Sequence, residues 1–189
     1  MKKQELKNKR RDYLSWSQLN LWERNPESYK EVYIYGRGIY PSKYLDLGKE
    51  LAEALENGQS KDAMINHLRT FLPKCPKVEY EIRAKLNGIN LLGKLDGYIP
   101  RKKTIIEIKT GKKWTQGMVD KSGQLTFYAL LVWLKYKKMP EIKLYWCPTK
   151  EEDGELKLTG EIKTFTTKRS QIDLLRFIKN AYSQYLQSE

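Results

Sequence analysis

Three charged side chains interrupt an otherwise apolar β-hairpin in the middle of the sequence. Asp96 lies in the first arm, and Glu107 and Lys109 lie in the second, although the interiors of strands disfavour all three residue types. If the turn is centred after Arg101, residues at equal distances from it face each other, which places Asp96 opposite Glu107. Because side chains alternate along a strand, Lys109 lies on that face too. The hairpin is therefore predicted to bring two carboxylates and one ammonium group together.

This trio predicts a metal-dependent phosphodiesterase site. Two adjacent carboxylates repel each other and resist ionisation, and a hard divalent cation such as Mg²⁺ removes that conflict. The cation can polarise a phosphodiester and activate a water molecule, while the ammonium group of Lys109 stabilises charge on the phosphate oxygens. The alternative is a solvated surface with cross-strand ion pairs. The isoleucines around Glu107, with Ile106 and Ile108 directed into a core, and the glycines at 93 and 97 argue against it.

The composition limits the class of protein. A chain of 189 residues suits a single domain spanning 1–189, and its net charge of +13 suggests a polyanionic partner such as nucleic acid. Ribosome-associated and membrane-surface proteins share such a charge. No apolar run reaches the ~20 residues of a membrane span, and the basic residues 1–12, an expected mobile arm, lack the apolar stretch of a secretory signal. The two cysteines, Cys75 and Cys147, are too few for a four-cysteine metal site. We therefore expect a cytoplasmic protein.

The periodicity of apolar residues predicts a mixed α/β domain. Helical signals occupy four segments near the N-terminus and two later ones: 17–25, 26–36, 44–58, 60–73, 123–138 and a last helix capped by Thr167. Strand alternation occupies five segments: 77–86, 89–99, 104–110, 141–147 and 155–167. Asn87-Gly88 is a strong hairpin signal between the first two strands. This order predicts a central sheet with helices packed against it.

Three stretches resemble the RecB-like branch of the PD-(D/E)XK nuclease superfamily, which includes phage exonucleases and CRISPR adaptation nucleases. They are G-K-L-D-G-Y at 93–98, I-I-E-I-K-T-G at 105–111 and G-Q-L-T-F-Y-A at 123–129. An acid in one strand, E-x-K in the next and Q-x-x-x-Y on the following helix form a specific combination. The opening helices at 15–36 are also similar, and the resemblance spans roughly residues 13–150. It implies a restriction-endonuclease-like αβββαβ core.

The resemblance also implies roles for individual residues. Asp96 and Glu107 become metal ligands together with the backbone carbonyl of Ile108, and Lys109 becomes the catalytic lysine. Gln124 and Tyr128 are four residues apart and so lie on one helix face, which in this family borders the active site and the DNA. Ordinary helix packing is the alternative for this pair.

The sequence departs from the family pattern at two positions. Many members carry a metal-binding histidine where this chain has Ala52, so Glu50, Glu53 or a water molecule is expected to fill that place. His67, the only histidine, is a weaker candidate, and a surface or helix-packing residue is the alternative. Iron–sulfur members carry a cysteine where this chain has Asn25, so we expect no iron–sulfur cluster.

Basic residues near the hairpin predict a path for the substrate. Lys112, Lys113 and Trp114 follow the third strand, and Arg101 lies in the turn before it. Such lysines and arginines contact phosphates without reading sequence, and an indole can stack on an unpaired base. A solvated turn is the alternative.

These observations lead to a metal-dependent deoxyribonuclease as the main hypothesis. We expect it to use Mg²⁺ or Mn²⁺ and to act as an exonuclease on DNA ends or single strands, in recombination, repair or phage DNA processing. The alternatives are a nucleic-acid-binding module of the same fold with weak or no catalysis, a structure-directed endonuclease, and a basic scaffold protein.

Overall fold

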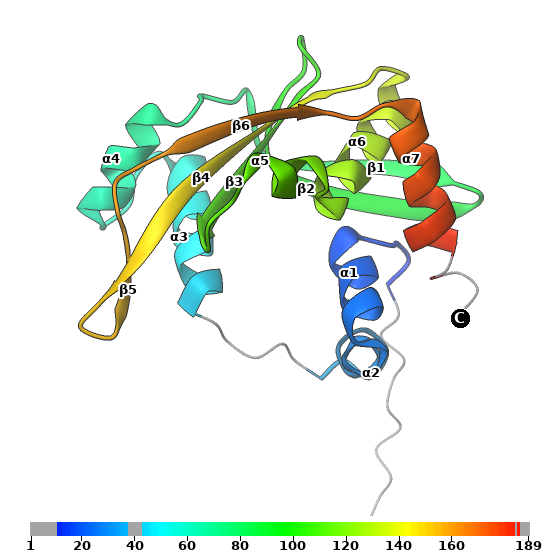
Figure 1. Ribbon diagram of the computed structural model, residues 1–189, viewed down its shortest axis with the longest axis horizontal. Helices are drawn as coiled ribbons and strands as arrows, with labels where there is room; N and C mark the ends of the chain where they lie inside the picture. The colour runs from blue at the N-terminus through cyan, green and yellow to red at the C-terminus, as the bar shows by residue number, and fades with distance from the viewer. Residues whose placement is uncertain (1–10, 38–42, 184, 186–189) are drawn as a thin grey trace, which may run out of the picture.

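A six-stranded sheet lies at the centre of the structure, a computed structural model that describes residues 11–37, 43–183 and 185 (Figure 1). The strands are β1 (Lys77–Leu86), β2 (Ile89–Ile99), β3 (Thr104–Gly111), β4 (Glu141–Glu152), β5 (Glu155–Leu158) and β6 (Lys163–Lys168). The order is β1-β2-β3-β4-β5, and β6 also pairs with β4. Neighbouring strands are antiparallel except β3 and β4, which are parallel.

Helices precede, separate and follow the strands. They are α1 (Trp16–Arg24), α2 (Pro26–Tyr29), the π-helix η1 (Lys30–Ile34), α3 (Lys43–Asn57), α4 (Ala63–Phe71), α5 (Gln116–Asp120), α6 (Gly123–Tyr136), α7 (Gln171–Phe177) and the π-helix η2 (Ile178–Tyr182). The parallel pairing of β3 with β4 requires a crossover connection, which α5 and α6 supply. The succession from α3 to β4 confirms the expected mixed α/β class and the αβββαβ order.

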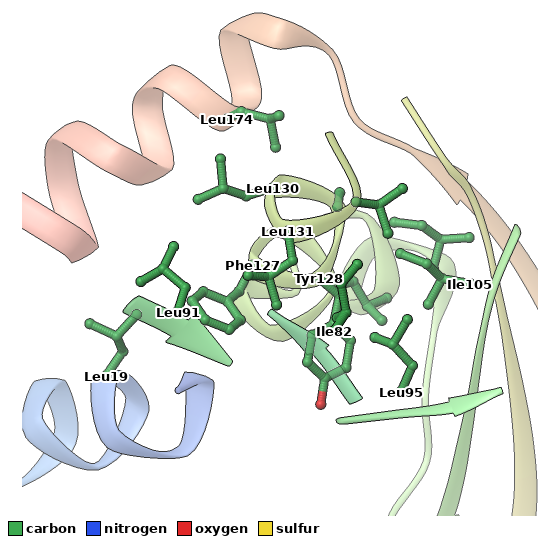
Figure 2. Close-up of a cluster of buried hydrophobic side chains, with 14 of the residues drawn as sticks. Leu19, Ile82, Leu91, Leu95, Ile105, Phe127, Tyr128, Leu130, Leu131 and Leu174 are labelled. Carbon is green, nitrogen blue, oxygen red and sulfur yellow. The ribbon is translucent and has the colours of Figure 1, made fainter. Parts of the chain in front are cut away.

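Hydrophobic clusters cover both faces of the sheet. The larger cluster joins one face to α1, α6 and α7, and Figure 2 shows Leu95, Ile105, Phe127 and Leu174 within it. Residues 125–132 of α6 are all buried there, which explains why this helix is apolar on every side. The smaller cluster packs α3 and α4 against the other face of β4, where Cys147 is buried.

Both predicted hairpins form in the predicted register. Leu86 pairs with Ile89 across the Asn87-Gly88 turn, whose two residues both have positive φ angles, of 47° and 85°. Across the second turn, Ile99 pairs with Thr104 and Gly97 with Ile106, as a turn centred after Arg101 requires. The pairing of β2 with β3 ends at Gly97 and Ile106. Asp96 and Glu107 therefore do not form the cross-strand pair that the sequence predicted.

The structure corrects the expected elements near the C-terminus. The segment 155–167 is two strands rather than one, because the chain turns at Gly160, where φ is 85°, and β5 and β6 each pair with β4. Thr167 lies in β6, and the helix α7 is capped by Ser170, whose hydroxyl accepts a hydrogen bond from the Asp173 N–H at 3.2 Å. The short helix α5 was not expected from the sequence.

The N-terminal arm expected at 1–12 lies mostly outside the described residues. Arg11, which is described, places its guanidinium 5.1 Å from the centre of the Tyr33 ring and donates a hydrogen bond to the Tyr13 hydroxyl. None of the helices in the described ranges has the length and apolar character to cross a membrane.

Candidate active site

Strand β2 separates from β3 at Asp96. The β1–β2 pairing skips Asp96 and its neighbour Glu79, whose φ of 48° is rare for a glutamate. The Asp96 carboxylate accepts a hydrogen bond from the backbone N–H of Ile108 at 2.6 Å. The Asp96 side chain therefore takes the Ile108 N–H that continued pairing of β2 with β3 would have used. Because the two strands diverge here, the Asp96 carboxylate faces a cavity.

Glu107 is a buried carboxylate with one partner. Its side chain is 1% exposed, and the Lys109 Nζ lies 2.5 Å from its Oε1 atom. Apart from this ion pair, neither carboxylate oxygen has a hydrogen-bond partner among the residues that the structure describes. A buried charge is costly unless it is paired and hydrogen-bonded. The unused oxygens of Glu107 therefore provide a place where a second cation would be favourable.

The charges of this site interact strongly. Burial, followed by the charge of Glu107, raises the pKa of Asp96 to about 8, although Lys109 and the Ile108 N–H act in the opposite direction. Burial lowers the pKa of Lys109, but the two carboxylates raise it more, so its pKa lies above the ordinary value. The raised pKa of Lys109 favours its charged form, and the raised pKa of Asp96 favours a protonated carboxyl, whose proton a divalent cation would displace. The donor set fits Mg²⁺ or Mn²⁺.

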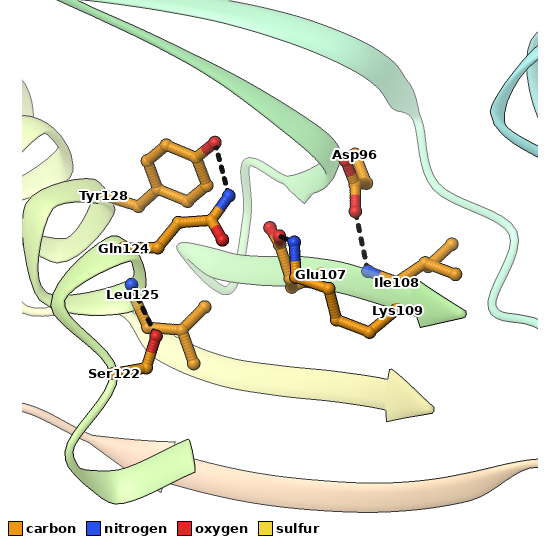
Figure 3. Close-up of polar contacts among 8 residues, drawn as sticks. All are labelled: Asp96, Glu107, Ile108, Lys109, Ser122, Gln124, Leu125 and Tyr128. Atoms are coloured by element: carbon orange, nitrogen blue, oxygen red, sulfur yellow. Dashed lines mark hydrogen bonds and ion pairs between the residues drawn. The ribbon is translucent and has the colours of Figure 1, made fainter. Parts of the chain in front are cut away.

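Gln124 and Tyr128 lie on the other side of Glu107, on the first turns of α6 (Figure 3). Ser122 caps this helix, and the Gln124 Nε2 donates a hydrogen bond to the Tyr128 hydroxyl at 3.0 Å. Burial and the charge of Glu107 raise the pKa of Tyr128, which therefore remains a neutral phenol. The structure thus brings this predicted pair to the carboxylates.

The two glycines near Asp96 make room for protein side chains. A Cβ atom on Gly93 would lie 2.5 Å from the Leu131 side chain, and one on Gly97 would lie 2.5 Å from the Cys75 sulfur. Packing against α6 at Gly93 and against the loop before β1 at Gly97, rather than an approaching ligand, accounts for the two positions.

Ala52 lines a small cavity of about 60 Å³ together with Asp96 and Ile108. The two glutamates expected as replacements for a histidine at this position lie elsewhere. Glu53 is exposed, and Glu50 accepts a hydrogen bond from the Ser60 hydroxyl at 3.2 Å, because both point away from the buried face of α3. Neither lines the cavity.

His67 is exposed on α4, with its ring 5.0 Å from that of Phe71. It does not line the cavity either, which favours the surface role. No three His, Cys, Asp or Glu side chains in the described ranges are placed to hold a metal together. The candidate centre therefore depends on two carboxylates and backbone.

Sequence reasoning missed Glu79, which lines the cavity with Asp96 and Ala52. It forms an ion pair with Lys94 and contributes to the raised pKa of Asp96. A signal for it was present, because the tight Asn87-Gly88 turn places Glu79 opposite Asp96.

The predicted DNA-contacting residues fall into two groups. Lys112 and Lys113 are exposed directly after β3, and Trp114 beside them is half-buried against the larger hydrophobic cluster. Arg101 is exposed in the β2–β3 turn, at the opposite end of β3. The structure therefore does not bring Arg101 together with the other three, because a strand of eight residues separates them.

No protein-family model matches the chain, and no curated protein sequence matches it significantly. Among solved structures, a candidate exonuclease from Eubacterium rectale superposes with a TM-score of 0.62 at 13% identity, covering 99% of this chain and 85% of that one. The protein SSO0001 gives a TM-score of 0.50 at 16% identity, covering 93% and 77%. A phage-related exonuclease from Haemophilus somnus reaches 0.45 at 16% identity, covering 88% and 75%, too distant to support an argument. The chain thus shares its mixed α/β fold with the first two proteins.

Proposed function

We propose that the protein is a Mg²⁺- or Mn²⁺-dependent deoxyribonuclease of the RecB-like PD-(D/E)XK branch. The observation that carries this proposal is a buried, hydrogen-bond-deficient carboxylate at Glu107 whose charge acts on a second carboxylate at Asp96 and helps to raise its pKa. Sequence-tolerant processing of DNA ends or single strands fits better than restriction-type cutting, because the chain has a large positive charge and no motif for reading sequence. The fold shared with a candidate exonuclease agrees with this reaction class.

Asp96, Glu107 and the carbonyl of Ile108 would hold the metal, which when bound polarises the scissile phosphodiester and activates a water molecule. The hydrogen bond from the Ile108 N–H fixes the Asp96 carboxylate beside β3. Lys109, charged and held at Glu107, donates hydrogen bonds to phosphate oxygens as their negative charge increases. Gln124 and Tyr128 orient the strand with neutral hydrogen bonds, since the phenol stays protonated.

Degradation of end-labelled DNA in Mg²⁺ and Mn²⁺ tests this proposal. Glu107→Gln and Lys109→Gln should each lower the rate by about 100-fold or more, a loss typical of a removed charge-stabilising group. Lys85→Gln, an exposed lysine of β1, is the matched control. A well-folded Glu107→Gln or Lys109→Gln variant with parental activity would refute the role of that residue. Cutting of closed circular DNA would indicate the endonuclease alternative.

A nucleic-acid-binding module without catalysis is the second candidate. The observation that favours it is the absence, in the described ranges, of three clustered metal-binding side chains, together with Ala52 in the cavity. Binding to DNA with no degradation in either metal would support this candidate.

A further inference from the structure

A groove of about 630 Å³ lies between α1, η1 and the first turn of α6. Its walls include Trp16, Asn20, Leu21, Val32, Tyr33 and Gln124. This volume lies within the range of sites that bind small organic molecules. None of the residues on α1 or η1 has a role in the chemistry proposed above.

Gln124 connects this groove to the candidate active site. Its side chain lines the groove, and its amide donates to the Tyr128 hydroxyl, beside Glu107 (Figure 3). A nucleotide bound at the carboxylates would therefore have its neighbour close to the groove.

The aromatic wall of the groove is held in place by a glycine. Trp16 packs so closely on Gly123 that a Cβ atom there would lie 2.3 Å from the indole. Gln124 follows Gly123 in the chain and lines the same groove, so this close approach fixes the indole in the wall that also includes Gln124.

The chemistry of the groove matches a nucleobase rather than a phosphate. Leu21 and Val32 are apolar, and the amides of Asn20 and Gln124 offer both donors and acceptors, as the edges of unpaired bases require. Among the described lining residues, the one cation is Arg37, and it is ion-paired with Glu31. A neutral, flat and partly polar group is the ligand that such walls accommodate best.

We propose that this groove receives an unpaired base of the strand being cut and thereby selects single-stranded DNA and overhangs. This inference rests on the proposed nuclease function and names its substrate class. Bases in a duplex are paired and stacked, and they would have to leave the helix to enter the groove.

Binding without metal tests the groove separately from catalysis. In EDTA, the affinity of the parent would be measured by fluorescence anisotropy for three labelled oligonucleotides: a single strand, the same strand with abasic sites, and a blunt duplex. Base contacts with aromatic and polar walls predict that the single strand binds about tenfold more tightly than the abasic strand.

A substitution that fills the groove should remove this difference. Ser17 is exposed and lines the groove, so Ser17→Tyr should weaken binding of the single strand about tenfold and leave the abasic strand and the duplex unchanged. Glu23→Tyr, on the exposed part of α1 outside the groove, is the control for bulk. It removes an acid, which strengthens DNA binding, and so cannot imitate the expected loss. Asn20→Ala, which removes an amide without adding bulk, should give a smaller loss in the same direction.

Unchanged single-strand affinity in folded Ser17→Tyr protein would overturn the proposal, and so would an equal loss for single and abasic strands. If the parent degrades DNA but binds abasic and normal strands equally, the nuclease function stands and the groove assignment fails. If base-dependent binding is present without degradation in Mg²⁺ or Mn²⁺, the nuclease function fails and the groove remains a base-binding site.

Discussion

The carboxylate of Glu107 is as buried as the side chain of Ile106 beside it, since each is 1% exposed. An isoleucine gains from such burial, whereas a carboxylate loses its hydration and must recover it from partners. Lys109 supplies one partner, and no other group in the described part of the chain hydrogen-bonds to either oxygen. The site is therefore arranged at a cost to stability that a bound cation would offset, which is typical of functional carboxylates.

The raised pKa of Asp96 gives the metal-free protein a defined pH dependence. Between the ordinary pKa of 3.8 and about 8, the folded protein holds a proton that the unfolded chain has released. Because the unfolded state then binds fewer protons, the free energy of unfolding falls as pH rises through this window. Asp96→Asn removes this loss, so its melting temperature in EDTA should exceed that of the parent at pH 9 by several degrees.

The measurement is thermal unfolding in EDTA between pH 4 and pH 9. Asp46→Asn, an exposed carboxylate of α3, controls for the loss of one charge. Parallel curves for the parent and Asp96→Asn would show that Asp96 does not hold the extra proton.

Ala52 offers a direct test of the metal position. It lines the cavity with Asp96, so Ala52→His should add an imidazole donor. Imidazole favours Mn²⁺ over Mg²⁺, and the variant should therefore bind Mn²⁺ more tightly by calorimetry, with a smaller gain for Mg²⁺. Glu53→His, the adjacent exposed position, is the matched control. Equal Mn²⁺ affinity in the parent and Ala52→His would mean that position 52 does not face the metal.

At the scale of elements, the parts predictable from the sequence were those fixed by local rules. The Asn87-Gly88 turn and the alternation around it determine the register of β1 and β2, and the apolar run of α6 requires a buried helix. The same counting predicted Asp96, Glu107 and Lys109 on one face, but the cross-strand pairing that it assumed for Asp96 and Glu107 does not form; extended to β1, it would have found Glu79. The interruption of pairing at Asp96 was not predictable, because it arises from the positive φ of Glu79 and from a side chain that bonds to the neighbouring strand.

The short helix α5 escaped prediction because a distant residue helps to hold it. Arg169 is 6% exposed, and its guanidinium makes five hydrogen bonds, to the hydroxyls of Thr126 and Thr167 and to the carbonyls of Val119, Ser122 and Lys168. It connects the segment after β6 to α5 and to the start of α6. No local pattern in the sequence indicates this contact.

Arg169→Met should therefore loosen α5 and the first turn of α6. The substitution removes five hydrogen bonds from a largely buried cluster, and we expect a loss of about 2–4 kcal/mol in the free energy of unfolding. Urea denaturation measures the loss, and faster amide hydrogen exchange at 116–126 would locate it. Arg176→Met, an exposed arginine of α7, is the control and should change stability little. Equal losses of stability in the two variants would show that Arg169 does not hold α5 and the start of α6 in place.

For the whole molecule, the excess of positive charge should govern how DNA is bound. The net charge of +13 predicts strong salt dependence of DNA binding, because each neutralised phosphate releases counterions. The log of the affinity should fall linearly with the log of the salt concentration, by about 0.7 per phosphate on single strands and about 0.9 on duplex DNA. A slope near zero would contradict binding through phosphates.

The two basic groups at the ends of β3 should contribute unequally to that slope. Lys112 and Lys113 directly follow the C-terminal end of β3, beyond Glu107 and Lys109. Arg101 and Lys102 are exposed in the turn before its N-terminal end. If the strand being cut passes over the first pair, replacing both lysines with glutamine should lower the single-strand slope by about 1.4, the share of two phosphates. Replacing Arg101 and Lys102 removes the same charge and should change the slope much less. The comparison requires salt titrations of both double variants in EDTA, and equal reductions would show that the DNA path extends over the turn, as the sequence alone suggested for Arg101.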